Sequence, residues 1–254
     1  HGAGLAATRV AWLTARMLTL DDQDRPTDET VAFWRSAGMD ASVLEARLKE
    51  RPFHFADVVA PIPLGYSRLD EEGRIEMGGR TWTVRLGQGH APDHATFWSE
   101  DDPLVIGGDQ LLSSISPNLG VYATEPEADP VAEWLESCHR FQSHALPDHF
   151  VLPGHKLPYR GLPTRLAQLI ENHEGALKRL RRHLARPASA VECFPPLFKR
   201  AIGPGEYGLA MVEAVAHCVH LWQSGEAVRT RRDDGAWAYQ MKDPDHGPED
   251  PDDG

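Results

Sequence analysis

The stretch TWTVRLGQGHAPDHATFWSEDDPLVIGGD, residues 81–109, decides the fold that we expect for this chain. It holds two apolar runs of strand type, TWTVRL (81–86) and PLVIGG (103–108). The first run leads through a Gly-Gln-Gly turn to His90, and the second leads directly to Asp109. A third run, HFVLPGH (149–155), ends on His155 in the same manner. Strands that each deliver a polar side chain at the carboxyl end would gather these groups along one edge of a sheet.

These three side chains are suited to binding metal. Imidazole and carboxylate groups are the usual ligands of catalytic zinc, which keeps one position open for a water molecule. The two oxygens of Asp109 could bridge two cations, and a hydroxide held between them would be the nucleophile. A polar residue at the end of one strand is common in any loop, but three such ends, each beside a glycine, favour a metal site.

Composition sets broad limits on the protein class. The 254 residues are 41% hydrophobic and 25% charged, which is ordinary for a globular protein. No apolar run approaches the roughly 20 residues that span a bilayer, so we expect no membrane contact. The three cysteines are widely spaced and predict reduced thiols, most of them buried, in a cytoplasmic protein.

The net charge of −12 is unevenly distributed. Residues 1–155 are acidic, residues 156–242 are basic, and residues 243–254 are acidic again. The acidic first part argues against general nucleic-acid binding there, whereas the basic part leaves that question open.

The residues before the central stretch predict short helices and then a β-meander. Helices are expected at 10–20, at 29–38 after a cap at Thr27 or Asp28, and at 41–51 after a cap at Asp40. The meander is expected over 61–86. Aromatic side chains here and beyond could line a substrate pocket, although packing in the core is the more common role of such rings. The candidates are Trp12, Trp34, Phe53, Phe55, Tyr66 and Tyr159.

After the central stretch the pattern becomes helical. An amphipathic helix is expected over 129–145, with Asp129 as N-cap and Pro130 in the first helical position, and a long helix over 163–186. Two further helices and a hairpin with an Asp-Gly turn come next, which is the pattern of a winged-helix domain. The tail 243–254 has a composition typical of disorder.

The motifs GHAPDH, VIGGDQLL and VLPGHKLPYRG resemble the later metal motifs of the metallo-β-lactamase superfamily, in a bacterial branch with a C-terminal winged helix. SPNLGVYATEPEADP and HEGALKRL also resemble that branch, so the likeness covers nearly the whole chain. It implies an α+β fold, the αββα sandwich, with a catalytic domain over 1–162 that includes a helical insert at 10–51. A linking helix and winged-helix-like domain would occupy 163–242.

The resemblance also implies roles for individual residues. His90 and His155 would each ligate one of two divalent cations, which we expect to be zinc, with iron and manganese as alternatives. Asp109 would bridge the cations as the central catalytic residue, and Asp93 and His94 would orient His90 and its loop. The superfamily's main ligand motif, HxHxDH, is absent from these residues, and HGAGLAAT resembles the segment immediately downstream of it. We therefore expect that motif upstream of residue 1, with the first part of the sandwich missing here.

Two other clusters receive a weaker functional interpretation. Glu213, His217 and His220 are spaced to share a helix face and could bind metal, although packing is the more common role. The basic residues of the rear part could contact nucleic acid, although such runs are usually solvated. These residues are Lys178, Arg179, Arg181, Arg182, Arg186, Arg229, Arg231 and Arg232.

Three hypotheses for the function remain open at this stage. The first is a metal-dependent hydrolase of a small ester-like substrate, most plausibly a thioester, as in hydroxyacylglutathione hydrolases, or else a lactone. The second is a metal-dependent endoribonuclease. The third is a non-catalytic protein whose winged helix mediates dimerisation or another interaction, and a homodimer is compatible with each of the three.

Overall fold

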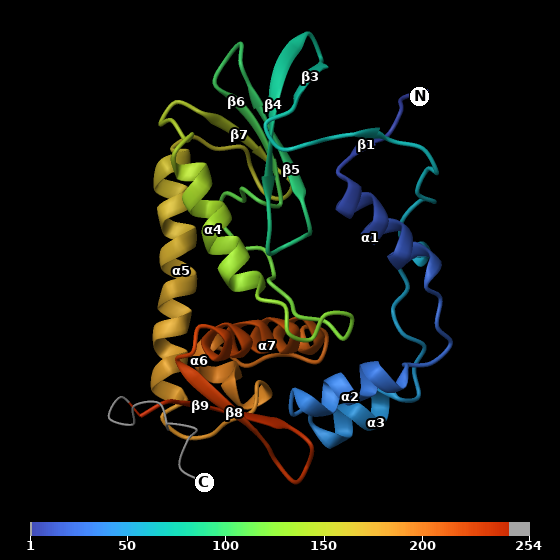
Figure 1. Cartoon of the computed structure of the whole chain (residues 1–254), viewed down its shortest axis with the longest axis vertical. Helices are drawn as coiled ribbons and strands as arrows, with labels where there is room; N and C mark the ends of the chain where they lie inside the picture. Colours follow the sequence, from blue (N-terminus) through green and yellow to red (C-terminus); the bar gives the residue numbers. More distant parts are fainter. Residues whose placement is uncertain (1, 244–254) are drawn as a thin grey trace, which may run out of the picture.

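A computed structural model describes residues 2–243, and a five-stranded sheet forms one end of it (Figure 1). The strand order is β3-β4-β5-β6-β7. The strands are β3 (Arg74–Met77), β4 (Arg80–Gly87), β5 (His94–Ser99), β6 (Leu104–Gly108) and β7 (Phe150–Pro153). The expected strands at 81–86, 103–108 and 149–155 are thus confirmed.

Strand direction brings the three candidate ligands to one edge of the sheet. β4 pairs antiparallel with β5, β5 pairs antiparallel with β6, and β6 pairs parallel with β7. It follows that β4, β6 and β7 run in the same direction and end at the same edge. His90 follows β4, Asp109 follows β6, and His155 follows β7.

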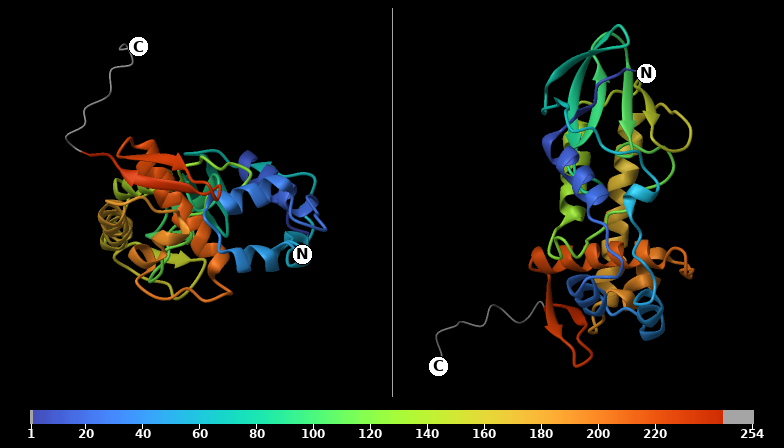
Figure 2. Two further views of the ribbon diagram at one scale, coloured as in Figure 1. Left: turned by 90° about the horizontal axis from the view of Figure 1, so that it is seen from below. Right: turned by 90° about the vertical axis from the view of Figure 1, so that its right-hand side faces the viewer.

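Two helices, α4 (Pro130–Gln142) and α5 (Leu162–His183), lie beside the sheet (Figures 1 and 2). Asp129 caps α4 as expected, because its Oδ1 accepts the N–H of Ala132 at 3.0 Å. The core between helices and sheet contains Trp134 and Phe141 of α4 and Val105 and Val151 of the strands, each at most 1% exposed. Burying side chains of this size stabilises the fold by roughly 1.5–3 kcal/mol each.

The C-terminal part consists of η2 (Val191–Cys193), α6 (Phe194–Phe198), α7 (Tyr207–Gln223) and a hairpin of β8 (Ala227–Arg231) and β9 (Trp237–Met241). α5 is a single 22-residue helix that runs from the sheet to these elements (Figure 1). Buried residues of α5 and α7 belong to the same hydrophobic cluster as those of the sheet. The core is therefore continuous from the sheet to the C-terminal hairpin.

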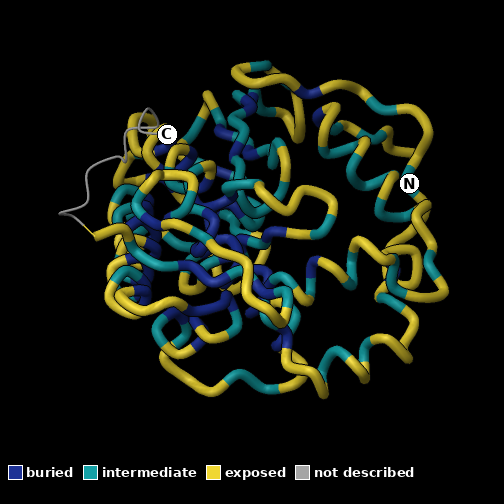
Figure 3. The backbone as a smooth tube through the Cα atoms, turned by 60° about the horizontal axis from the view of Figure 1, so that its bottom comes forward, coloured by how far each residue is buried: buried dark blue, intermediate teal, exposed yellow. Residues whose placement is uncertain are grey.

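The N-terminal elements lie on the opposite side from α5 (Figure 1). They are β1 (Ala6–Ala7), α1 (Arg9–Leu20), α2 (Asp28–Ser36), α3 (Ala41–Arg47), η1 (Phe55–Asp57) and β2 (Ser67–Arg68). No residue of α1 is buried. Figure 3 shows the contrast: buried segments concentrate around the sheet, α4, α5 and α7, and the N-terminal segments are mostly exposed or half-buried.

Three sequence expectations need correction. The meander over 61–86 is wrong in its first part, because β2 pairs with β1 and only β3 and β4 form a hairpin. The helix expected over 41–51 ends at Arg47, and the Asp40 carboxylate accepts a hydrogen bond from the Tyr207 hydroxyl instead of capping it. β5 was not expected as a strand. The tail expected to be disordered lies, from residue 244 on, outside the described residues.

Two expectations about the chain as a whole can be compared with the structure. All three cysteines, Cys138, Cys193 and Cys218, are buried as free thiols. Within residues 2–243, no helix combines the length and apolar character that crossing a membrane requires.

Candidate metal centre

His90, Asp109 and His155 meet at the edge of the sheet. Nε2 of His90 lies 3.5 Å from Oδ2 of Asp109, and Nε2 of His155 lies 3.5 Å from Oδ1 of the same carboxylate. The Asp109 side chain is 30% exposed, and those of His90 and His155 are 27% and 64% exposed. Each imidazole therefore faces a different oxygen of one accessible carboxylate.

The hydrogen bonding of His90 leaves its Nε2 available as a ligand. Its Nδ1 lies 2.9 Å from the carbonyl oxygen of Asn118. A carbonyl oxygen can only accept, so Nδ1 carries the proton and donates it, and in the neutral ring Nε2 keeps a lone pair. That lone pair faces the carboxylate of Asp109. Two electron-rich atoms face each other here, an arrangement that a cation between them would stabilise.

The separation also fits shared coordination. Two donor atoms bound to one tetrahedral zinc at about 2.0–2.1 Å lie roughly 3.4 Å apart. The 3.5 Å between each imidazole nitrogen and its carboxylate oxygen is close to this value and too long for a strong hydrogen bond. No three His, Cys, Asp or Glu groups within the described part of the chain surround a single point. In a two-cation centre, Asp109 and one imidazole would supply only two protein ligands to each cation, so this finding does not conflict with such a centre.

Glycine beside each ligand lets neighbouring segments approach closely. A Cβ on Gly108 would lie 2.5 Å from Cε1 of His94, and a Cβ on Gly154 would overlap Oδ1 of Asp109. Gly89 has a φ of 93°, and a Cβ there would lie 2.7 Å from Cβ of Trp134 on α4. The glycines seen in the sequence motifs are thus required by space, and at positions 89 and 108 also by positive φ.

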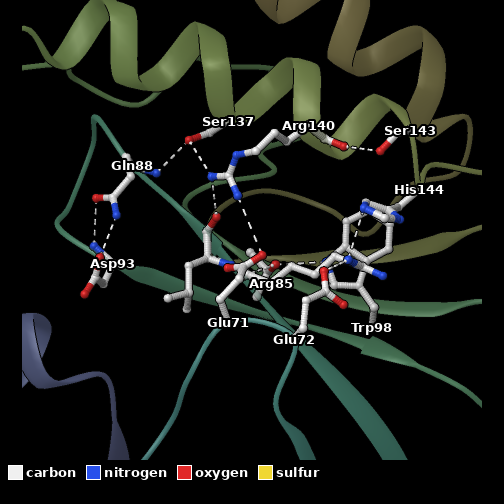
Figure 4. A network of polar contacts seen from close by, with 12 residues as sticks. Glu71, Glu72, Arg85, Gln88, Asp93, Trp98, Ser137, Arg140, Ser143 and His144 are labelled. Carbon is white, nitrogen blue, oxygen red and sulfur yellow. Dashed lines mark hydrogen bonds and ion pairs between the residues drawn. The ribbon is translucent and has the colours of Figure 1, made fainter.

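The loop that carries His90 is fixed at its base (Figure 4). The amide of Gln88 binds Asp93 twice: its Nε2 donates to Oδ1 at 2.6 Å, and its Oε1 accepts the Asp93 backbone N–H at 2.9 Å. The backbone N–H of Gln88 donates to Oγ of Ser137 on α4 at 2.9 Å. Asp93 adopts a left-handed φ of 47°, which the Gln88 contacts hold in place. Asp93 therefore lies at the base of the loop, and its predicted role in orienting His90 stays a prediction.

His94 contacts Asp109 directly. Its Nε2 accepts the backbone N–H of Asp109 at 3.3 Å, whereas its ring centroid is 6.5 Å from that of His90. Burial, together with the neighbouring His90, lowers the pKa of His94, which favours the neutral ring that this acceptor role requires. His94 is therefore placed to orient the turn that carries Asp109. Its influence on the His90 ring is less direct.

The six aromatic candidates do not form one pocket. Trp12 stacks on Tyr66 with ring centroids 5.0 Å apart, and Phe53 and Phe55 form an edge-to-face pair at 5.1 Å that lines a cleft of about 410 Å³ beside α2. Trp34 packs against the core. The cleft does not include His90, Asp109 or His155.

The Tyr159 hydroxyl donates to the Leu111 carbonyl at 3.3 Å, and burial raises the pKa of the phenol. This contact gives Tyr159 a structural role near the Asp109 turn.

The second histidine cluster is divided among different partners. Glu213 accepts a hydrogen bond from Asn118, His220 lies 3.0 Å from the Asp129 carboxylate, and His217 is 2% exposed. These side chains do not converge on one point, so the packing interpretation fits them better than a metal site.

Several of the basic residues in the rear part are paired. Arg181 binds Glu226 through two hydrogen bonds of 2.6 and 2.8 Å, Arg229 pairs with Glu127, and Arg232 pairs with Glu192 at 2.9 Å. Arg179 donates to the carbonyls of Pro196 and Leu197. These contacts reduce the positive charge that the region offers to nucleic acid.

Sequence reasoning missed the residues that support the ligands. Gln88, Ser137 and Asn118 hold the loop and the ring of His90, and none was predicted to do so. Gln88 carried a usable signal, because it stands between the two glycines of the turn that leads to His90. Asn118 acts through its backbone carbonyl, which any residue type would supply.

Comparisons with known proteins identify the family to which the fold belongs. A family model for the metallo-beta-lactamase superfamily matches residues 25–185, and a model for a metallo-beta-lactamase-like C-terminal domain matches residues 177–242. The chain belongs to the metallo-beta-lactamase superfamily.

Individual relatives extend this result. A protein of Bacillus subtilis (strain 168) named "Probable metallo-hydrolase YqjP" is 26% identical over 161 residues, which are 62% of this chain and 49% of that protein. The chain thus spans about half the length of this curated relative. The crystal structure of a beta-lactamase domain protein from Burkholderia ambifaria has a TM-score of 0.83 and 34% identity, and covers 94% of this chain and 67% of that one. A metallo-beta-lactamase family protein from Thermus thermophilus shares the fold, with a TM-score of 0.70, 24% identity and coverage of 95% and 72%.

Proposed function

We propose that this chain contributes His90, Asp109 and His155 to a two-cation centre of a hydrolase. The observation that carries the proposal is the position of two imidazole nitrogens on opposite oxygens of one carboxylate, each at 3.5 Å. The superfamily membership and the relative named as a metallo-hydrolase support it. Zinc suits the donor set, and the further ligands of each cation would come from water, substrate or residues outside those described.

The chain's own residues would act mainly by positioning. When bound, the cations would supply a water of lowered pKa and a positive charge near the attacked carbonyl group. Asp109 would hold the two cations at a fixed separation, because its carboxylate is rigid and its turn is tied to His94. His90 would remain in one tautomer through its bond to Asn118. The exposed His155 would border the open side of the centre, where substrate enters.

We propose a thioester as the substrate class, with a lactone as the next choice. The Trp12–Tyr66 stack supplies an apolar surface of the kind that contacts a small organic molecule, whereas the Phe53–Phe55 pair lines a cleft apart from the centre. A small acyl substrate needs no extended basic surface, which agrees with the ion pairs of the basic residues.

The experiment measures metal content and turnover together. Full-length protein loaded with zinc is tested on a panel of thioesters and lactones, beside the variants His90→Ala, Asp109→Ala and His155→Ala. His139→Ala on α4 serves as the control, because His139 is an exposed histidine of α4. We expect each of the three variants to lose zinc and turnover and the control to keep both. Turnover that persists unchanged in His90→Ala, or no turnover of any substrate, would contradict the proposal.

An endoribonuclease and a non-catalytic interaction protein stay as alternative proposals for the function. An endoribonuclease would show RNA binding that weakens steeply with salt. A non-catalytic role for a winged-helix-like C-terminal domain would show an intact protein without bound metal. Homodimer formation and a cytoplasmic location are further proposals, and sedimentation analysis tests the first of them.

A further inference from the structure

The segment 116–123 connects the candidate metal centre to the C-terminal helix α7. The backbone N–H of Val121 donates to the carbonyl of Val212 at 3.1 Å. The side-chain amide of Asn118 donates to the carbonyl of Leu209 at 3.1 Å and to Oε2 of Glu213 at 2.7 Å. About one turn of α7, from Leu209 to Glu213, thus holds this segment through three hydrogen bonds.

The same residue that binds α7 also binds His90. The backbone carbonyl of Asn118 accepts the Nδ1 proton of His90 at 2.9 Å, while its side chain faces Glu213. The position of this carbonyl determines which nitrogen of His90 carries the proton, and hence which nitrogen can bind metal. One residue therefore links a carboxylate of α7 to the imidazole at the sheet edge.

The link is built from buried and tightly packed parts. Leu119 and Val121, on either side of Gly120, are 0% exposed. A Cβ on Gly120 would lie 2.9 Å from Cγ2 of Val212 on α7, so the segment approaches the helix as closely as its backbone permits. Such packing leaves the segment little freedom to adjust if one of its hydrogen bonds is lost.

The orientation of Asn118 follows from its partners. Its amide nitrogen faces two acceptors, the Leu209 carbonyl and the Glu213 carboxyl, and can donate one proton to each. An aspartate at this position would place a negative charge against both acceptors. The contact therefore selects an amide at position 118 and an acceptor at position 213.

We propose that Glu213 is a positioning residue of the metal centre: it orients Asn118, which fixes the tautomer of His90 and so raises the affinity for the cation that His90 binds. The role in metal binding rests on the proposed function above. The fixed tautomer itself does not, because it is a property of the metal-free protein.

The test uses full-length protein and two readouts. Long-range ¹H–¹⁵N correlation spectra of metal-free protein report the His90 tautomer, and competition with a chelating dye reports zinc affinity. The variants are Glu213→Ala and Asn118→Ala, which remove the contact, and Glu213→Gln, which keeps an acceptor oxygen. Glu226→Gln is the matched control, because Glu226 is a carboxylate of the same C-terminal region that binds Arg181 instead.

We expect wild type, Glu213→Gln and Glu226→Gln to show the Nδ1–H tautomer of His90 and equal zinc affinity. Glu213→Ala and Asn118→Ala should show mixed tautomers and a loss of zinc affinity of roughly ten- to a hundred-fold. If Glu213→Ala is too unstable to study, Asn118→Ala tests the same contact. An unchanged His90 tautomer in a folded variant overturns the proposal.

Failure of the proposed function gives a different result. In that case wild type would bind no zinc, but the tautomer would still change from wild type to Glu213→Ala.

Discussion

Gly154 lies against the carboxylate of Asp109 with no room for a side chain between them, because a Cβ on Gly154 would overlap Oδ1. The backbone reinforces this approach: the N–H of Gly154 donates to the carbonyl of Gly108 at 2.7 Å. The turn after β7 thus closes over the turn after β6. The carboxylate of Asp109 is thus confined by Gly154, and the backbone N–H of the same residue donates to Nε2 of His94.

Gly154→Ala should therefore reduce metal binding without a strained φ, since φ at position 154 is not positive. The added methyl group must displace Asp109, and we expect a zinc affinity roughly ten-fold lower, or weaker still, by dye competition. Gly175→Ala on α5 is the control, because its Cβ would meet only Nη1 of Arg179, at 3.5 Å. It should raise thermal stability slightly, as alanine favours helix over glycine. Equal zinc affinity of Gly154→Ala and wild type would contradict the close approach.

Acid should destabilise the protein through two stacked histidines. Burial lowers the pKa of His173 to about 3 and that of His217 to about 4, and their ring centroids lie 5.7 Å apart. Folding favours the neutral rings, so their contribution is complete above the unfolded pKa of about 6.5 and is lost as pH falls toward 3–4. At pH 5 each ring should cost roughly 2 kcal/mol of unfolding free energy. Urea unfolding at pH 7 and pH 5 measures this loss.

His217→Leu should remove about half of that difference between pH 7 and pH 5. His139→Leu, which changes an exposed histidine of α4, should leave it unchanged. If the wild-type free energy of unfolding is the same at pH 7 and pH 5, burial of His173 and His217 does not oppose their protonation and the prediction is wrong.

Alkaline pH should act in the opposite direction through Glu213. Burial raises the pKa of this carboxyl to about 7. Folding favours the protonated form, so its contribution is complete below the unfolded pKa of about 4.5 and is lost as pH rises through 7. Glu213→Gln cannot ionise, and at pH 9 it should exceed wild type by roughly 3 kcal/mol more than at pH 4. Chemical denaturation of metal-free protein at both pH values tests this; a difference that does not vary with pH would refute it.

Arg229 should contribute strongly to the C-terminal hairpin. Its guanidinium carbon lies 3.5 Å from the ring centroid of Trp222 and 4.5 Å from that of Trp237, and the group pairs with Glu127. Arg229→Ala should lower the free energy of unfolding by roughly 2 kcal/mol. Arg229→Lys keeps the positive charge but loses the planar stacking on the tryptophan rings. Its free energy of unfolding should lie between those of wild type and Arg229→Ala. Tryptophan fluorescence during urea unfolding reports the change.

Arg200→Ala provides the comparison for Arg229, since Arg200 forms an exposed pair with Glu206. Exposed pairs of this kind contribute little, so the unfolding midpoint should not move measurably. Equal effects of the two substitutions would mean that the aromatic stack adds nothing to stability.

The sequence predicted those parts of the fold whose causes are local. α1, α2, α4, α5 and α7 carry helical periodicity and, in most cases, a cap, and the hairpin β8–β9 turns at Gly235 with a φ of 85°. The prediction of a meander strand over 61–69 was wrong for a local reason as well. The two prolines of this run lack the N–H that a central strand must donate, and Leu64 is 78% exposed. β5 was overlooked because it begins at His94, inside what reads as a turn.

The candidate site could be predicted in part. The sequence pattern indicated His90, Asp109 and His155 as candidate metal ligands, because each follows an apolar strand and a glycine. Their meeting depends on strand direction, which the sequence suggests only through the resemblance. The bond between Asn118 and Glu213 joins residues 95 positions apart, and no local pattern marks such a pair.

The unbroken course of α5 has a mechanical consequence. The two family models overlap over residues 177–185, and this stretch is still helical as far as His183, where α5 ends. Rotating one region against the other at this overlap would require breaking main-chain hydrogen bonds in the last turns of α5. Because one hydrophobic cluster also extends from the sheet to the hairpin, the hairpin region should melt together with the sheet in one cooperative transition. Dividing the gene at residue 177 would separate the last turns of α5 from the rest of the helix.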